Sequence, residues 1–166
     1  MLTQKYMDFV EKAAALLQSN FKLTKTPNLY NYDEVKNFFE KSGAKFENID
    51  KKNLLIDKDG KEYLSVEYAN KFFYDMWKFI ACKITQELEK ETDLCEQITN
   101  NRMINMCATL FSRAMIMPKE IFIRYIFENI NEDGTYPIEV VSNYFNVHPF
   151  EITVRGRDLD MWGKNN

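Results

Sequence analysis

The sequence predicts an α+β domain that is mostly α-helical and carries a small antiparallel β-sheet. Apolar residues recur at helical spacing along most of the chain, whereas an Asp59-Gly60 pair separates two short β-rich runs. Only 5 glycines and 4 prolines interrupt the 166 residues, and the 45% hydrophobic content is enough for one core. We therefore expect a single domain over residues 1–166. Within it we expect N-terminal helices over 1–43, a core over 44–130 and a C-terminal segment over 131–166.

Two amphipathic helices are expected before the sheet. The first spans about residues 3–20, where apolar side chains recur at i, i+3, i+4 and i+7. These side chains are Tyr6, Phe9, Val10, Ala13, Leu16 and Leu17. The second helix begins after Asp33, a favourable N-cap residue. It carries the apolar residues Val35, Phe38 and Phe39 and ends at Gly43, where a left-handed backbone conformation costs little.

A β-hairpin and a long helix follow. We expect two or three antiparallel strands, over Ala44–Asp50, Lys52–Asp57 and Glu62–Tyr68, with the turn at Lys58-Asp59-Gly60-Lys61. From about residue 68 to residue 90, the apolar side chains lie within ~60° of one another on a helical wheel. These side chains are Ala69, Phe73, Met76, Ile80 and Ile84. We expect this central helix to lie in the core beside the sheet.

The remaining segments predict helices that are separated by proline and by a loop. One helix is expected over residues 96–117, and Pro118 marks its boundary because the residue before a proline is pushed out of the α conformation. A second spans 119–129, and a short third is opened by Pro137. One further helix is expected within 146–159.

The overall charge and the cysteines narrow the function classes. With a formal net charge of −3 and a pI near 5.3, the chain lacks the excess of Lys and Arg that non-specific nucleic-acid binding requires. No apolar stretch approaches the ~18 residues of a membrane span, so we expect a cytoplasmic protein without membrane contact. Cys82, Cys95 and Cys107 are widely spaced, which favours reduced thiols over disulfides or a zinc–thiolate site.

The segment from Phe111 to Pro118, Phe-Ser-Arg-Ala-Met-Ile-Met-Pro, resembles a signature of the ImmA/IrrE family of zincin-like metallopeptidases. The family's helix reads Glu-x-x-Ala-Asn-x-Phe-Ala-x-x-Leu-Leu-Met-Pro. Matching places are held by Ala108, Phe111, Met115, Ile116, Met117 and Pro118, while Thr109 replaces the Asn. The family also places a sheet and an Ile-Ala-His-Glu-Leu-Gly-His helix before this signature, where this chain has Ile80-Ala81-Cys82-Lys83-Ile84-Thr85-Gln86. The resemblance covers roughly residues 30–160 and implies a zincin-like domain.

Carried over residue by residue, the resemblance implies that the zinc site is lost. Cys82 and Gln86 stand in place of the two zinc-binding His residues. Lys83 replaces the general-base Glu, and Asn105 replaces the downstream Glu ligand. Catalytic zinc needs three protein ligands and an open position, whereas neutral amides are poor ligands and a Lys ammonium repels the cation. On helical wheels Cys82, Gln86 and Asn105 lie away from the apolar stripes, as a vestigial cleft requires. We expect no metal, no cofactor and no catalytic residue.

The C-terminal segment resembles the family's helix-turn-helix, in which a Phe-x-Val-Ser turn joins two short helices. Phe145 and Val147 match the buried turn positions, and His148, the only histidine, replaces the Ser as a cap or a surface residue. Arg155 and Arg157 are the candidate nucleic-acid contacts. Groove binding is not expected, however, because acidic residues surround these arginines and a glycine in the second helix weakens it by ~1 kcal/mol. The residues concerned are Glu151, Gly156, Asp158 and Asp160.

The sequence thus predicts a catalytically inactive pseudopeptidase that regulates a protein partner. The resemblance implies that active members of the family cleave helix-turn-helix repressors of mobile elements or stress regulons. The resemblance therefore implies such a repressor as the partner and a prophage or conjugative element as the origin. Two alternatives stay open: a DNA-associated regulator acting through residues 137–160, and a metallopeptidase with unorthodox ligands. Cys82 itself has one further interpretation, as a reactive thiol that is activated by the neighbouring Lys83.

Overall fold

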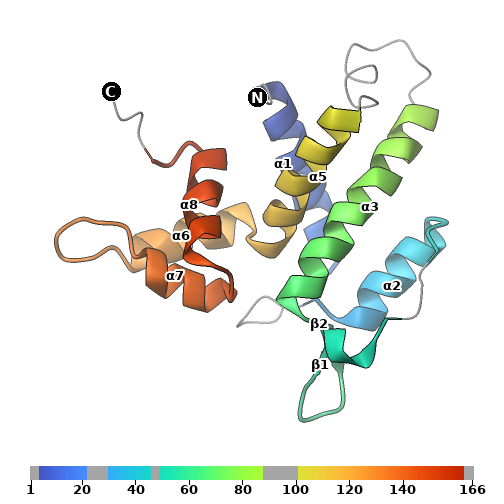
Figure 1. Cartoon of the computed structure of the whole chain (residues 1–166), viewed down its shortest axis with the longest axis horizontal. Coiled ribbons are helices and arrows are strands. Elements are labelled where there is room, and N and C mark those ends of the chain that lie inside the picture. Colours follow the sequence, from blue (N-terminus) through green and yellow to red (C-terminus); the bar gives the residue numbers. More distant parts are fainter. Residues whose placement is uncertain (1–3, 22–29, 46–48, 88–100, 163–166) are drawn as a thin grey trace.

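The computed structural model describes residues 4–21, 30–45, 49–87 and 101–162, and the side chains of 84–87 and 101 are outside the description. Within these ranges the chain forms seven α-helices and one two-stranded antiparallel sheet, which confirms the mostly α-helical α+β class (Figure 1). The helices are α1 (Gln4–Gln18), α2 (Tyr32–Lys41), α3 (Val66–Glu87), α5 (Asn101–Ile116), α6 (Lys119–Glu128), α7 (Ile138–Phe145) and α8 (Pro149–Asp158), and the strands are β1 (Leu54–Ile56) and β2 (Glu62–Leu64). Among the described helices, none combines the length and apolar character that a bilayer span requires.

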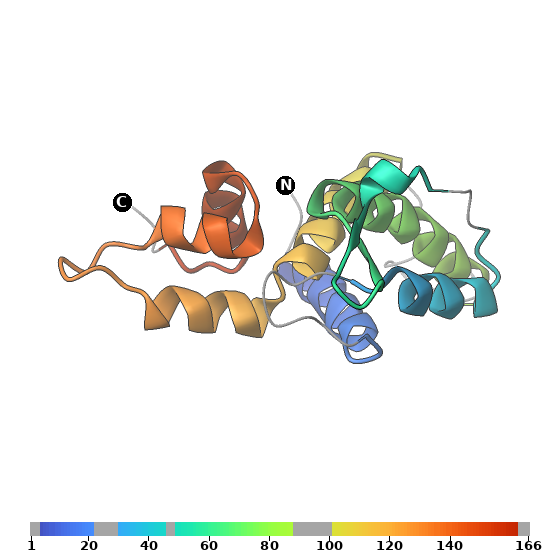
Figure 2. The ribbon, with the colours of Figure 1, turned by 90° about the horizontal axis from the view of Figure 1, so that it is seen from below.

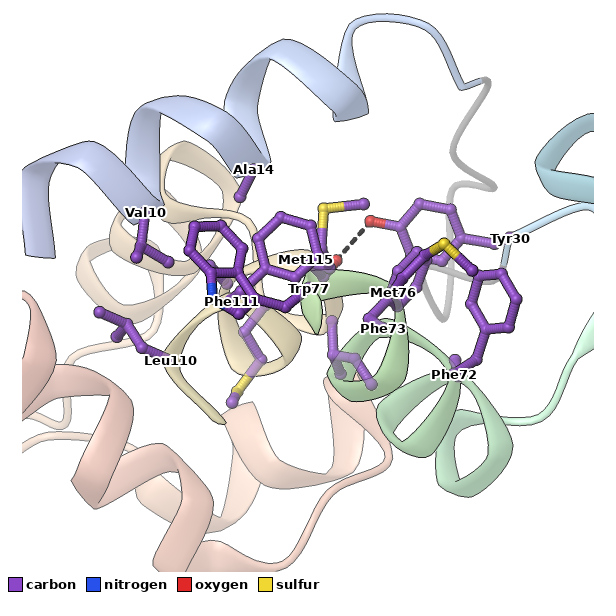
Figure 3. Close-up of a cluster of buried hydrophobic side chains, with 14 of the residues drawn as sticks. Val10, Ala14, Tyr30, Phe72, Phe73, Met76, Trp77, Leu110, Phe111 and Met115 are labelled. Atoms are coloured by element: carbon purple, nitrogen blue, oxygen red, sulfur yellow. Dashed lines mark hydrogen bonds between the residues drawn. The ribbon is translucent and has the colours of Figure 1, made fainter. Parts of the chain in front are cut away.

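The core lies where α5 packs against the central helix α3 on one side and α1 on the other, and α3 runs away from the hairpin while α5 runs back toward it (Figure 1). Trp77 of α3 and Phe111 of α5 are fully buried, with ring centroids 5.0 Å apart. Tyr30, just before α2, is also buried, and its hydroxyl donates a hydrogen bond to the carbonyl oxygen of Met115 (Figure 3). Large rings that fill the space between helices account for this part of the fold's stability.

The hairpin is shorter than the sequence predicts. Its strands cover only three residues each, Leu54 faces Leu64 in the register, and the turn falls at the expected place, with Gly60 at φ +78°. The carboxylate of Asp57 accepts hydrogen bonds from the backbone N–H groups of Asp59 and Lys61, both at 2.9 Å, and so closes the turn. Residues 51–53 form a 3₁₀ turn instead of strand. The described part of the expected third strand, residues 44–45 and 49–50, is not extended sheet, and 46–48 lie outside the described residues.

Two helix starts also differ from expectation. Asn31, not Asp33, is the N-cap of α2: its side-chain oxygen accepts a hydrogen bond from the N–H of Glu34 at 3.0 Å. The strand expected to reach Tyr68 ends at residue 64, because Ser65 accepts from the N–H of Tyr68 at 3.3 Å and α3 begins at Val66. A side-chain oxygen that satisfies an N–H of the first turn fixes a helix start in both cases. Residues 88–90 and 96–100, expected to be helical, lie outside the described residues.

The last three helices form a separate layer that extends away from α1, α3 and α5 (Figure 2). Tyr125 of α6 stacks on Tyr144 of α7, with ring centroids 3.9 Å apart. As expected, α7 and α8 are two short helices joined by a tight turn, in which Asn146 takes a left-handed conformation at φ +53°. His148 caps α8, since its Nδ1 accepts from the N–H of Phe150 at 3.2 Å, which confirms the capping role predicted for this histidine.

Candidate functional site

Polar side chains lie on the outer sides of α3 and α5 where the two helices pack together. On α3 these residues are spaced four apart, and on α5, which runs in the opposite direction, they are also spaced four apart. Because residues four apart lie on one face of a helix, the two rows face one another across the helix pair. We call these residues the α3–α5 seam: Asn70, Tyr74 and Lys78 on α3, and Asn105, Thr109 and Arg113 on α5.

In one part of the seam, Tyr74 contacts both Asn105 and Lys78. The hydroxyl of Tyr74 donates a hydrogen bond to the Oδ1 of Asn105 at 3.0 Å. The ammonium of Lys78 lies 4.9 Å from the centroid of the Tyr74 ring, close enough for a cation–π interaction. The same ammonium is 3.9 Å from a carboxylate oxygen of Asp75, in a pair that is half exposed and therefore weak. The result is a partly buried aromatic ring surrounded by hydrogen-bonding groups.

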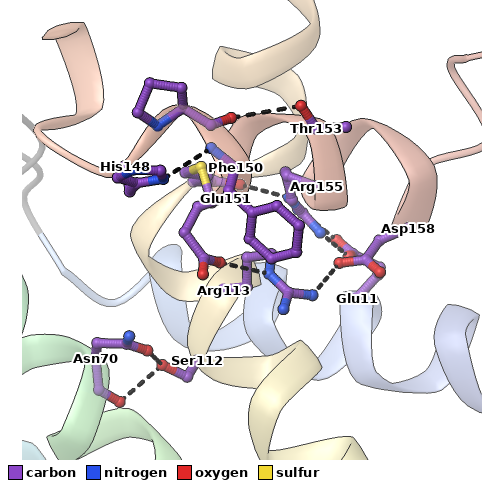
Figure 4. A network of polar contacts seen from close by, with 12 residues as sticks. Glu11, Asn70, Ser112, Arg113, His148, Phe150, Glu151, Thr153, Arg155 and Asp158 are labelled. Carbon is purple, nitrogen blue, oxygen red and sulfur yellow. Dashed lines mark hydrogen bonds and ion pairs between the residues drawn. The ribbon is translucent and has the colours of Figure 1, made fainter. Parts of the chain in front are cut away.

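At the lower part, the seam ends in a small cavity of about 100 Å³ between α3, α5 and α8. Asn70, Thr109 and Arg113 line it together with Glu151 of α8. The guanidinium of Arg113 is held by two carboxylates of α8, through Nε to Glu151 at 3.2 Å and Nη1 to Asp158 at 2.5 Å (Figure 4). Burial raises the pKa of Asp158, and Arg113 opposes this shift. The seam therefore connects the helix pair to the C-terminal layer.

The four predicted vestigial positions are not arranged as the sequence analysis expects. Cys82 and Lys83 are exposed on α3, and Gln86 belongs to the same helix but to the part whose side chains are outside the description. Asn105 is exposed on α5, and its side-chain hydrogen bond goes to Tyr74. Tyr74 precedes Cys82 by eight residues, about 12 Å along a helix that rises 1.5 Å per residue. The structure thus brings Asn105 to an earlier part of α3 than predicted.

The seam offers little to a metal ion. Its side chains are a phenol, an ammonium, amides, a hydroxyl and a guanidinium, whereas zinc prefers imidazole, thiolate and carboxylate. Among the described residues, no group of three His, Cys, Asp or Glu is placed to hold a metal. Cys107 is buried on the inner side of α5, where desolvation raises the pKa of its thiol to about 11. The seam is suited to hydrogen bonding and packing rather than to metal chemistry.

The predicted nucleic-acid contacts need a correction. Arg155 is fully buried: its guanidinium binds Glu11 of α1 through two nitrogens, and its Nε donates to the carbonyl oxygen of Met117 at 3.0 Å. Arg155 cannot reach a phosphate, because its guanidinium would have to leave a buried ion pair, and breaking such a pair is strongly destabilising. Arg157, two residues later, is exposed. Only one of the two arginines is therefore available on the surface of α8.

The sequence analysis missed Tyr74, Lys78 and Arg113. A signal for the first two exists: Tyr74, Asp75 and Lys78 have the i, i+1, i+4 spacing of a His-Glu-x-x-His motif, but none has its residue type. Without the contact to Asn105, nothing in the sequence favours the set Tyr74, Asp75 and Lys78 over the later set Cys82, Lys83 and Gln86.

No family model matches the chain, and comparisons with curated proteins and with solved structures give no match.

Proposed function

We propose that the protein is a catalytically inactive zincin-like pseudopeptidase that regulates another protein by binding it through the α3–α5 seam. The observation that carries this proposal is the contact of Tyr74 with both Asn105 and Lys78. The zincin resemblance implies that the motif helix faces a second helix at the position that corresponds to the downstream Glu ligand. Here that place holds no imidazole and no carboxylate ligand pair.

The contact also favours a different register for the vestigial motif. In this register Tyr74 and Lys78 replace the two His residues, Asp75 replaces the general-base Glu, and Asn105 replaces the last ligand. Cys82, Lys83 and Gln86 then lie two turns beyond the former site. Either register lacks the imidazole pair, so the conclusion that hydrolysis is lost does not depend on the choice.

The chemistry of the seam supports binding in place of hydrolysis. A metallopeptidase uses its metal to activate water, and in the proposed register the ammonium of Lys78 stands in place of the second imidazole. Asp75 lies beside this ammonium, so its carboxylate is engaged by a cation. Tyrosine is enriched among residues that dominate protein–protein binding energy, because it combines a large apolar ring with a hydrogen-bonding end. A protein partner, such as the helix-turn-helix repressor that the resemblance implies, would contact Tyr74.

Rebuilding the zinc site in each register tests the proposal. One quadruple variant is Tyr74→His, Asp75→Glu, Lys78→His and Asn105→Glu. The other is Cys82→His, Lys83→Glu, Gln86→His and Asn105→Glu. We expect the wild-type protein to be isolated without stoichiometric zinc and to cleave no repressor. We expect the first variant alone to gain one tightly held zinc per chain, measured by elemental analysis and by competition with a chromophoric chelator.

The two variants serve as controls for each other, since both introduce the same residue types on the same helices. Zinc binding by the second variant alone would show that the vestigial motif lies at Cys82, Lys83 and Gln86, as the sequence predicts. Failure of both would contradict the zincin arrangement, and one tight zinc in the wild-type protein would favour a metallopeptidase with unorthodox ligands. The DNA-associated alternative is weakened by the burial of Arg155.

A further inference from the structure

The end of the molecule where α6 passes into α7 is both acidic and apolar. Residues 127–140 contain no Lys or Arg and four acidic residues, so this segment carries −4 while the whole chain carries −3. The same segment holds four of the eight large hydrophobic side chains that are exposed in the described part of the chain. We call residues 127–140 the acidic end. Its acidic residues are Glu128, Glu132, Asp133 and Glu139, and its exposed apolar residues are Phe127, Ile130, Tyr136 and Val140.

The loop of this segment projects from the protein, while Tyr136 anchors its second arm: its ring centroid lies 4.4 Å from that of Trp162, and its hydroxyl donates to the carbonyl oxygen of Met161 at 3.3 Å. Figure 2 shows the loop between α6 and α7 projecting from the C-terminal layer, on the side away from α1 and α3. The N–H of Asn131 donates to the carbonyl oxygen of Thr135 at 3.1 Å, so the two arms of the loop are joined at its base. Ile130 and Tyr136 flank this hydrogen bond and are therefore neighbours, and Phe127 lies in the last turn of α6, three residues before Ile130.

The exposure of these side chains is not required by the fold. The core side of α6 is already formed by Phe122 and Ile126, which are fully buried. Phe127, by contrast, exposes 58% of its surface, although burial of a Phe side chain contributes about 2 kcal/mol. Single exposed apolar residues are ordinary, but several within one short projecting segment mark an interaction surface.

We infer that the acidic end is a docking surface for a cationic amphipathic segment of another protein. The charge selects this occupant. Nucleic acids and anionic membranes carry phosphates that these carboxylates would repel, because Arg124 of α6, 3.9 Å from Glu128, offsets only one of the four. A second copy of the chain would bring two such ends of equal sign together. A segment with one apolar and one basic face instead covers Phe127, Ile130 and Tyr136 and neutralises the surrounding carboxylates. This surface shares no residue with the α3–α5 seam, so the inference stands or falls separately from the proposed function.

A designed peptide is a suitable probe for this surface. The probe is a fluorescein-labelled amphipathic helix of about 18 residues made of Leu and Lys, with the Leu side chains on one face. Two control peptides have the same length: one with Glu in place of Lys, and one in which the Leu and Lys are permuted so that no apolar face forms. Fluorescence anisotropy with the full-length protein at ionic strengths of about 50 and 150 mM gives the affinities and their salt dependence.

We expect the amphipathic cationic peptide to bind at least about tenfold more tightly than either control peptide. The double variant Phe127→Ser/Ile130→Ser should weaken it about tenfold. The double variant Glu128→Gln/Glu132→Gln should weaken it and reduce the salt dependence. Leu16→Ser is the matched control, since Leu16 is 70% exposed on α1, and it should leave the affinity unchanged.

Equal binding of the permuted peptide, or equal weakening by Leu16→Ser, would show non-specific attraction and overturn the inference. Self-association of the protein that Phe127→Ser/Ile130→Ser abolishes, measured by analytical ultracentrifugation, would assign the surface to a second copy instead. Thermal unfolding followed by circular dichroism shows that each variant is folded before its affinity is compared.

Discussion

Arg155 of α8 binds both carboxylate oxygens of Glu11 of α1, a residue 144 positions away in the sequence. The guanidinium is fully buried, and its Nε also donates to the carbonyl oxygen of Met117 just after α5. One side chain thus connects the first helix, the end of α5 and the last helix. Together with the pairing of Arg113 to Glu151 and Asp158, this contact holds the C-terminal layer against the helix bundle.

Removal of one partner of this buried pair should be strongly destabilising. We expect Arg155→Ala to lower the free energy of unfolding by about 3–5 kcal/mol, because Glu11 and the Met117 carbonyl are left without their donor. Arg157→Ala is the matched control, since it removes an exposed arginine from the same helix, and its effect should stay within about 0.5 kcal/mol. Urea denaturation of both variants measures the difference. Similar effects for the two variants would contradict the contact between Arg155 and Glu11.

The pH dependence of stability should reveal the buried carboxyl of Asp158. Burial raises its pKa above the ordinary value of 3.8, so the folded protein holds this proton more tightly than the unfolded chain does. Between 3.8 and the raised pKa, the folded state binds more protons, and the free energy of unfolding falls as the pH rises.

Asp158→Asn isolates this effect. The pKa values of Asp50, Asp57 and Asp133 are lowered by hydrogen bonds, and these residues contribute the opposite trend in both proteins. We therefore expect the stability of the wild-type protein relative to Asp158→Asn to decrease as the pH increases above about 4, measured by urea denaturation at a series of pH values. A difference that stays constant or increases with pH would refute the assignment.

The regular elements could be predicted because each depends on short-range patterns. The apolar period places α3 within two residues of its observed start, and the Asp59-Gly60 turn lies where expected. The strands were predicted too long because residue preference does not show where a hydrogen-bonded ladder ends. That end is decided by Ser65, whose hydroxyl starts the next helix.

The candidate site could be predicted only in part, because its residues are selected by contacts between distant segments. A helical wheel correctly places Asn105 on an exposed face, but the wheel does not say which turn of α3 lies opposite. The same limit explains Arg155. The wheel of α8 cannot reveal that α1 covers this side of the helix, so the sequence predicts a surface arginine where the structure has a buried ion pair.

The start of α2 offers a direct comparison between the predicted and the observed cap. Asn31→Ala should lower the free energy of unfolding by about 1 kcal/mol, because the N–H of Glu34 loses its acceptor. Asp33→Asn should cost only about 0.3 kcal/mol, since Asp33 merely interacts with the helix dipole. Urea denaturation of the two variants distinguishes the caps. A larger effect at Asp33 would return the cap to the position expected from the sequence.

The absence of a side chain at Gly156 has a structural reason. The sequence suggests only that a glycine weakens the helix, but a Cβ at this position would overlap the indole of Trp162, whose Nε1 donates to the carbonyl oxygen of Thr153 at 2.5 Å. We therefore expect Gly156→Ala to lower the free energy of unfolding, although alanine favours a helix interior by about 1 kcal/mol. In a Trp162→Ala background the overlap is absent, so the same substitution should increase stability by up to about 1 kcal/mol. Urea denaturation of the four proteins completes this double-mutant cycle, and an equal effect of Gly156→Ala in both backgrounds would show that Trp162 does not pack on α8.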